Sequence, residues 1–211
     1  MDQGKILKEA CVESLQEAIM AEKNGADRIE LCAELNLGGT TPGYHLIEKA
    51  KAVLKIPIMV MIRPRGGNFI YNPMEIRLMK QSIDICKQLE VLGVVFGILD
   101  DKKQIDPIVT GMLADYSKPL KITFHKAIDE TPEPVESVKL LNKIPGITRI
   151  LTSGGKATAI EGAPMISKMI KKARPDLIII AAGKVTHENL HEISKIIPAT
   201  EFHGRRIVKM G

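Results

Sequence analysis

The chain has 211 residues, of which 45% are hydrophobic and 26% are charged, and its formal net charge at pH 7 is +5. These values are typical of a globular protein with one sizeable core, so we expect a single domain over residues 1–211. Aromatic residues make up only 3% and tryptophan is absent, which argues against binding of single-stranded nucleic acid by base stacking.

The chain contains three cysteines, Cys11, Cys32 and Cys86, and no C-x-x-C motif. An odd number of unclustered thiols argues against a disulfide scaffold and indicates a reducing compartment. The N-terminus lacks the apolar core of a signal peptide, and no stretch reaches the ~18 apolar residues of a membrane span. We therefore expect a cytoplasmic protein with no membrane partner. The densest basic run, Lys168–Arg174, is interpreted as a solvated helix face, so no nucleic-acid partner is expected.

Short apolar runs alternate with longer helical patterns along the whole chain. In chain order, the predicted strands are Ile6–Cys11, Arg28–Cys32, Ile58–Arg63, Val94–Leu99, Lys121–His125, Arg149–Thr152, Leu177–Ala181 and Glu201–His203. The predicted helices between them are Leu15–Asn24, Tyr44–Leu54, Pro73–Leu89, Pro107–Tyr116, Pro134–Lys143, Ala163–Ala173 and His187–Ile197. Pairs such as Asn72-Pro73 and Asp106-Pro107 are typical of helix starts.

This strict alternation predicts the α/β class and a TIM-like (β/α) barrel of eight parallel strands. A barrel is favoured over a doubly wound open sheet because closure leaves no unpaired edge. The sequence after Ile207 is too short for another helix, so the eighth outer helix is expected to be missing or vestigial. We expect the outer face of the last strand to be bare and covered by a second subunit, in a homodimer or higher homo-oligomer. Closure of the gap by the first and seventh helices is the alternative.

Several predicted strands end in polar residues, although strands buried on both faces should be apolar throughout. These residues are Glu9 and Cys11, Glu30 and Cys32, Arg63, Thr123 and His125, and Glu201 and His203. Because side chains alternate along a strand, residues two apart share one side, and these pairs are predicted to point into the barrel near its C-terminal rim. Arg63 is expected to pair with at least one of the glutamates, because buried charges need partners. The alternative is an inert but satisfied polar layer.

The loops after three strands predict anion-binding groups at the same rim. Arg63 and Arg65 flank a glycine pair, Ser153, Gly154 and Gly155 follow the sixth strand, and Gly183 with Lys184 follows the seventh. Glycine-rich turns present backbone N–H groups, and arginine forks bind carboxylates and phosphates. A tight turn with no ligand is the alternative for each motif taken singly.

Cys11 and Cys32 end neighbouring strands, which run ~4.8 Å apart in a sheet. Two soft thiolates at this spacing suit Cu(I), whereas Zn²⁺ needs further ligands such as His125 or His203. The alternative is a pair of buried cysteines that act as small hydrophobic residues. Cys86 is expected to be packed in the core.

The sequence resembles the CutC family. The resemblance is carried by the segments Ile29-Glu30-Leu31-Cys32, Gly38-Gly39-Thr40-Thr41-Pro42, Met61-Ile62-Arg63-Pro64-Arg65-Gly66-Gly67, Thr123-Phe124-His125-Lys126-Ala127 with Asp129, Arg149-Ile150-Leu151-Thr152-Ser153-Gly154-Gly155, and His203-Gly204. It implies a TIM-like barrel, a cytoplasmic address, oligomerisation, a role in copper homeostasis, and copper ligands at Cys11 and Cys32. Lys184 departs from the glycine-richer turn of relatives.

Two functions remain open. In the first, Cys11 and Cys32 hold Cu(I). In the second, the protein is an enzyme that acts on a small anionic or phosphorylated compound. Its anion site would comprise Arg63, Arg65, Ser153, Gly154, Gly155 and Gly183, and its acid–base groups would be His125, Asp129, Glu30 and His203. Lys126 is expected to point away from the barrel interior, which argues against Schiff-base chemistry.

Overall fold

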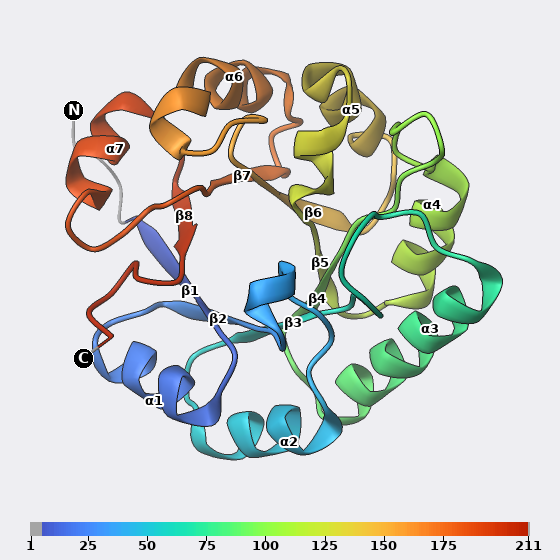
Figure 1. The fold of residues 1–211 in the computed structure, drawn as a ribbon, viewed down its shortest axis with the longest axis vertical. Coiled ribbons are helices and arrows are strands. Elements are labelled where there is room, and N and C mark those ends of the chain that lie inside the picture. Colours follow the sequence, from blue (N-terminus) through green and yellow to red (C-terminus); the bar gives the residue numbers. More distant parts are fainter. Residues whose placement is uncertain (1–5, 211) are drawn as a thin grey trace.

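The computed structural model describes residues 6–210 and shows a closed ring of eight parallel strands, each hydrogen-bonded to its sequence neighbours (Figure 1). The strands are β1 (Leu7–Val12), β2 (Arg28–Leu31), β3 (Ile58–Met61), β4 (Gly93–Phe96), β5 (Lys121–Phe124), β6 (Ile147–Thr152), β7 (Ile178–Ala181) and β8 (Glu201–Gly204). The predicted TIM-like barrel is confirmed. Residues 1–5 and 211, where the predicted single domain begins and ends, lie outside the described part.

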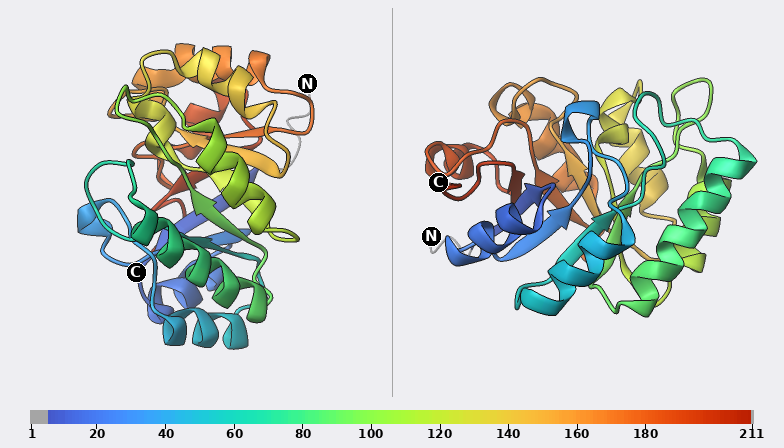
Figure 2. Two further views of the ribbon diagram at one scale, coloured as in Figure 1. Left: turned by 90° about the vertical axis from the view of Figure 1, so that its right-hand side faces the viewer. Right: turned by 60° about the horizontal axis from the view of Figure 1, so that its bottom comes forward.

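Seven α-helices surround the barrel within the described range (Figures 1 and 2). They are α1 (Leu15–Lys23), α2 (Tyr44–Val53), α3 (Pro73–Gln88), α4 (Pro107–Tyr116), α5 (Pro134–Leu141), α6 (Ala159–Lys172) and α7 (Leu190–Ile196). Two 3₁₀ helices, η1 (Leu35–Leu37) and η2 (Lys126–Glu130), follow β2 and β5. None of the helices among residues 6–210 is both long and apolar enough to cross a bilayer.

Local capping explains where the helices begin. The Asn72 side chain accepts hydrogen bonds from the first turn of α3 and Glu75 bonds back to the Asn72 N–H, so the predicted start at Pro73 is confirmed. Helix α6 begins at Ala159, four residues before the predicted start, because Thr158 and Glu161 form the same capping box. The predicted strand boundaries either match the structure or differ from it by one to three residues.

The strands separate two packed regions, one between the barrel and the helices and one inside the ring. Outward-facing strand residues pack against the helices in one large core, together with most buried helix residues. Inside the ring, Cys11, Cys32, Met59, Met61 and Val95 form one small apolar cluster, and Leu151, Ile180 and Ala182 form another. The predicted alternation along β1 and β2 therefore holds, and the polar side chains of these strands share the barrel interior with two apolar patches.

The expectation of a bare outer face on β8 is wrong. Phe202, which points outward from β8, is fully buried within the single chain. Ile207 and Val208, in the segment that follows β8, are also buried, and this segment runs between α7 and α1 in Figure 1. No eighth helix is present within residues 6–210. The reason for expecting a subunit over this strand is thus removed, and the oligomeric state stays a prediction.

A buried ion network lies in the barrel interior. Arg28 on β2 donates to Glu9, its register partner on β1, and to Glu201 on β8. The Arg149 Nε lies 3.2 Å from a Glu201 oxygen. The expectation that Arg63 pairs with one of the glutamates is wrong, because Arg28 serves two of them. Arg28 precedes Glu30 by two positions, so strand alternation alone places both side chains inside the ring.

Replacing Arg28 with alanine should destabilise the fold strongly. The change leaves the carboxylates of Glu9 and Glu201 without their shared cation in a site where Arg28 is only 2% exposed. Breaking a buried ion pair on one side costs about 3–5 kcal/mol, so we expect a loss of that size in the free energy of unfolding, measured with urea. The matched control is Arg77→Ala on exposed helix surface, with a change within about 0.5 kcal/mol. A loss for Arg28→Ala no larger than the control would contradict the assignment.

Candidate functional site

A small cavity opens at the C-terminal ends of the strands. Its volume is about 110 Å³. The short helix η1 lies over the centre of the barrel in Figure 1, above this end. The cavity is lined by Cys11, Glu30, Cys32, Leu35, Gly38, Met61, Arg63, Phe69, His125, Lys126, Leu151 and His203. Six of the residues predicted for the site thus meet in one cavity: Cys11, Glu30, Cys32, Arg63, His125 and His203.

The two predicted thiols lie side by side. The Sγ atoms of Cys11 and Cys32 are 3.9 Å apart, both residues are buried, and neither forms a disulfide. One carboxylate oxygen of Glu30 joins them in a group whose ligand atoms all lie within 4.8 Å of one another. Because a metal–thiolate bond is about 2.3 Å long, two sulfurs at this separation can both reach one ion. Cys86, on α3, is buried in the outer core as predicted.

The thiol pair shares a proton. The hydrogen bond from Cys32, helped by His203, outweighs the opposing effect of burial and lowers the pKa of Cys11 to about 5. The same hydrogen bond, together with burial, raises the pKa of Cys32 above its ordinary value. At neutral pH the pair is therefore one thiolate and one thiol, with a net charge of −1.

His203 links this pair to the ion network. Its Nδ1 lies 3.0 Å from Glu9 and its Nε2 lies 3.4 Å from Glu30. Burial opposes a charge on the ring, but Glu30, Cys11 and Glu9 outweigh it and raise the pKa of His203 well above its ordinary value. For Glu9, the bond to His203 and the charge of Arg28 overcome burial and lower the pKa to about 2. Burial, together with the Cys11 and Glu9 anions, raises the pKa of Glu30 well above its ordinary value, although the charge of His203 opposes this shift.

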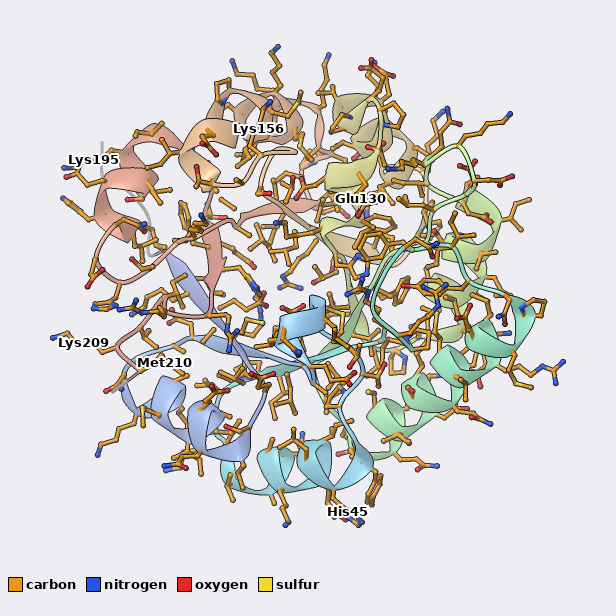
Figure 3. The ribbon with its side chains drawn as sticks, in the orientation of Figure 1. His45, Glu130, Lys156, Lys195, Lys209 and Met210 are labelled. Atoms are coloured by element: carbon orange, nitrogen blue, oxygen red, sulfur yellow. The ribbon has the colours of Figure 1, made fainter. Side chains whose placement is uncertain are left out.

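His125 is a neutral hydrogen-bond donor. Its Nδ1 accepts from the Ala127 N–H at 3.2 Å, which leaves the ring proton on Nε2. Burial and the charge of Arg63 lower the pKa of His125 to about 3, so the ring is uncharged at neutral pH. The Nε2 atom is buried and has no partner among the described residues. His45, His187 and His191 do not line the cavity, and His45 projects from α2 at the edge of the molecule in Figure 3.

Arg63 closes the cavity rather than neutralising a glutamate. Its guanidinium donates to the carbonyls of Leu37, Gly39 and Gly67 at 2.6 to 3.2 Å and lies 4.7 Å from the centroid of the Phe69 ring. These bonds tie the loop that carries η1 to the loop after β3. The Nε atom alone is buried without a partner among residues 6–210. Of the Arg63 donors, only the Nε–H is therefore free for the predicted anion binding.

The remaining predicted anion-binding residues lie outside this cavity. Arg65 forms an ion pair with Glu75 at 2.5 Å and donates to three backbone carbonyls. Asp129, which follows β5, accepts hydrogen bonds from the N–H groups of Ser153 and Gly155 and from two hydroxyl groups. The Asp129 carboxylate thus occupies the position that an anionic ligand would take in this glycine-rich turn. The N–H groups of Ser153 and Gly155 are therefore not available to a ligand. Gly154 donates to Thr152.

Sequence reasoning missed three contributors to the site. Arg28 was placed at the start of a strand but given no role, although its spacing from Glu30 was the available signal. Phe69 lies in a loop, where no periodicity places it against His125, with the ring centroids 4.8 Å apart. Lys126 was expected to point away, but it begins η2 and lines the cavity.

Comparison with known proteins identifies the family. The model of the CutC family matches residues 6–208. The chain belongs to the CutC family. The copper homeostasis protein cutC homolog of Homo sapiens is 41% identical over 197 residues, which cover 93% of this chain and 72% of that protein. A CutC family protein of Parabacteroides distasonis is 42% identical over 200 residues, which cover 94% and 82%.

A CutC crystal structure supports the same assignment. The copper homeostasis protein CutC from Streptococcus agalactiae matches with a TM-score of 0.91 and 36% identity, covering 96% of this chain and all of that one. The CutC resemblance found from sequence motifs is therefore confirmed, together with the barrel that it implied.

Burial and the charge of Arg63 keep the His125 ring uncharged down to about pH 4. Since its pKa in the folded state is about 3, below the ~6.5 of an unfolded chain, only the unfolded state takes up a proton between these values. We expect the ring to show no titration from pH 8 to pH 4 by NMR of labelled histidine. Its contribution to stability should fall as the pH drops below 6.5, by about 1.4 kcal/mol per pH unit.

The stability effect is isolated by comparison with His125→Gln, which removes the titrating group. This variant should lose less stability than the parent between pH 6.5 and pH 4. Titration of the His125 ring with a pKa near 6.5 would contradict the buried, neutral assignment.

Proposed function

We propose that this CutC family member binds Cu(I) through Cys11 and Cys32 and serves copper homeostasis. The observation that carries the proposal is the pair of free, buried thiols 3.9 Å apart, one of which already ionises at neutral pH. Soft thiolate sulfur is the ligand type that selects Cu(I). The relatives named copper homeostasis proteins support the cellular role.

Charge balance favours a monovalent ion. The thiol pair carries −1 with its shared proton, and two thiolates with Cu(I) also carry −1. Exchange of the proton for Cu(I) therefore leaves the buried site electrically unchanged beside the protonated His203. A divalent ion would add one positive charge next to His203, and Zn²⁺ would need ligands beyond the two thiols. Glu30, the third member of the cluster, could supply one further ligand.

The proposal includes a cytoplasmic location. All three cysteines of the described residues are free thiols, although Cys11 and Cys32 are close enough to interact directly. Thiols persist in reducing compartments, where Cu(I) is the stable form of copper in contact with sulfur. A homo-oligomer, as the family resemblance implies, stays part of the prediction.

Removal of either thiol should abolish tight Cu(I) binding. In anaerobic titrations against a competing Cu(I) chelator, Cys11→Ser and Cys32→Ser should each lose more than about 100-fold in affinity, since even loss of a supporting group costs 10–100-fold. Cys86→Ser is the matched control because this thiol is also buried, but in the outer core. Its affinity should equal that of the parent. Affinity that survives both single substitutions would refute the site.

A second candidate function is an enzyme that acts on a small anionic compound in the same cavity. The observation that favours it is the pair of buried donors without partners, His125 Nε2 and Arg63 Nε. Such donors attract oxygen acceptors and repel a cation. Glu30 would act as the acid because burial raises its pKa, with the Cys11 thiolate as base or nucleophile and His203 positioning both. Asp129 is committed to the turn after β6.

Alkylation of Cys11 tests this second candidate. Iodoacetate and iodoacetamide attack the same thiolate, but only iodoacetate carries a carboxylate that the two donors can bind. We expect the ratio of the iodoacetate rate to the iodoacetamide rate at Cys11, followed by mass spectrometry, to exceed the ratio for glutathione severalfold. His125→Gln should reduce it. A ratio equal to that of glutathione in the parent would rule out a small-anion site.

A further inference from the structure

A second concavity lies beside the cavity at the barrel mouth, between the loops that follow β7 and β8. We call it the β7–β8 groove. Its volume is about 500 Å³, and its walls include Lys126, Gly183, Lys184, Gly204, Arg205 and Arg206. It is thus several times larger than the cavity that holds the thiols.

The groove carries more positive than negative charge. Arg205 lies 3.2 Å from a Glu13 oxygen, and Lys126 lies 3.8 Å from Asp129. The side chains of Lys184 and Arg206 have neither an ion pair nor a hydrogen bond with any other described residue. Two cations on one concave surface are therefore free to bind an anion, with two more beside them.

The backbone holds Lys184 in an unusual conformation. Its φ is +54°, in the left-handed region that is costly for residues other than glycine, and Asn189 donates to its carbonyl at 2.9 Å. Gly183 has no room for a side chain, because a Cβ there would lie 2.9 Å from the Ser153 Cβ. The turn after β7 is therefore fixed by its packing, and the position of Lys184 on the groove wall is fixed with it.

The groove is continuous with the thiol site. Lys126 and His203 line both the groove and the cavity at the barrel mouth. A ligand anchored by an anionic group in the groove can therefore extend past His203 toward Cys11 and Glu30. Loops after the seventh and eighth strands of a (β/α)₈ barrel are also where this architecture accommodates phosphate.

We propose that the β7–β8 groove binds the phosphate group of a small phosphate monoester. A dianion matches the two free cations, Lys184 and Arg206. The groove offers a concave, local site rather than an extended basic stripe, and the chain lacks tryptophan, which disfavours nucleic acid. This phosphate site goes beyond copper binding and names a ligand class for the second candidate function. Phosphate binding itself rests on the groove alone, and only a reaction of the ligand at Cys11 and Glu30 rests on that function.

The test compares the full chain with two double variants. Lys184→Gly with Arg206→Gln removes both free cations, and glycine relaxes the left-handed backbone, so folding is not impaired. Lys168→Gln with Lys171→Gln removes two exposed lysines of α6 and is the matched control for net charge. Binding is measured by calorimetry with inorganic phosphate, glycerol 1-phosphate, glycerol and a ten-residue oligothymidylate.

The parent and the α6 control should bind both phosphates with equal affinity and should not bind glycerol. The groove variant should lose at least about tenfold in affinity, since one charge-assisted hydrogen bond is worth that factor. Equal phosphate affinity in the two double variants would overturn the proposal, as would binding of the oligonucleotide alone. Cys11→Ser should retain phosphate binding, so failure of the copper or thiol chemistry is distinguishable from failure of the groove.

Discussion

The pairing of Arg28 with Glu9 and Glu201 is the constraint on which the site depends. These three residues come from neighbouring strands and are at least 95% buried, so the barrel must close in one register to satisfy them. Glu9 uses its other oxygen to hold His203, and His203 in turn contacts Glu30 beside the thiols. The charge state of the cavity thus depends on the Arg28, Glu9 and Glu201 side chains, none of which lines the cavity.

This arrangement makes the thiol pair a site of fixed charge. His203 remains protonated between two carboxyl groups, and its positive charge favours the Cys11 thiolate. The hydrogen bond to Cys11, together with burial, raises the pKa of Cys32 and keeps this thiol protonated. A monovalent soft cation then replaces a proton without a change in buried charge, which is the physical basis of the copper proposal. The same protonated His203, and Glu30 with its raised pKa, would serve an enzyme. His203 also borders the β7–β8 groove. Copper binding and small-molecule chemistry would therefore both depend on the charge of His203 beside the thiol pair and Glu30.

Much of the fold and part of the site could be predicted from sequence. Strand alternation placed Glu9, Cys11, Glu30 and Cys32 inside the barrel because that rule is local and depends only on spacing. The partners of these groups depended on contacts between distant segments. Asp129 fills the turn at Ser153, and Arg63 binds the carbonyls of another loop. No local pattern reports such contacts, since a loop has no periodicity that fixes which way a side chain points.

The fixed charge of the thiol pair is tested most directly by the number of protons released when Cu(I) binds at pH 7. Calorimetry under anaerobic conditions, in buffers with different ionisation enthalpies and with correction for the chelator that supplies the ion, measures this number. We expect one proton to be released per Cu(I), because the thiol pair holds one. Release of two protons, or of none, would contradict the fixed charge of the pair.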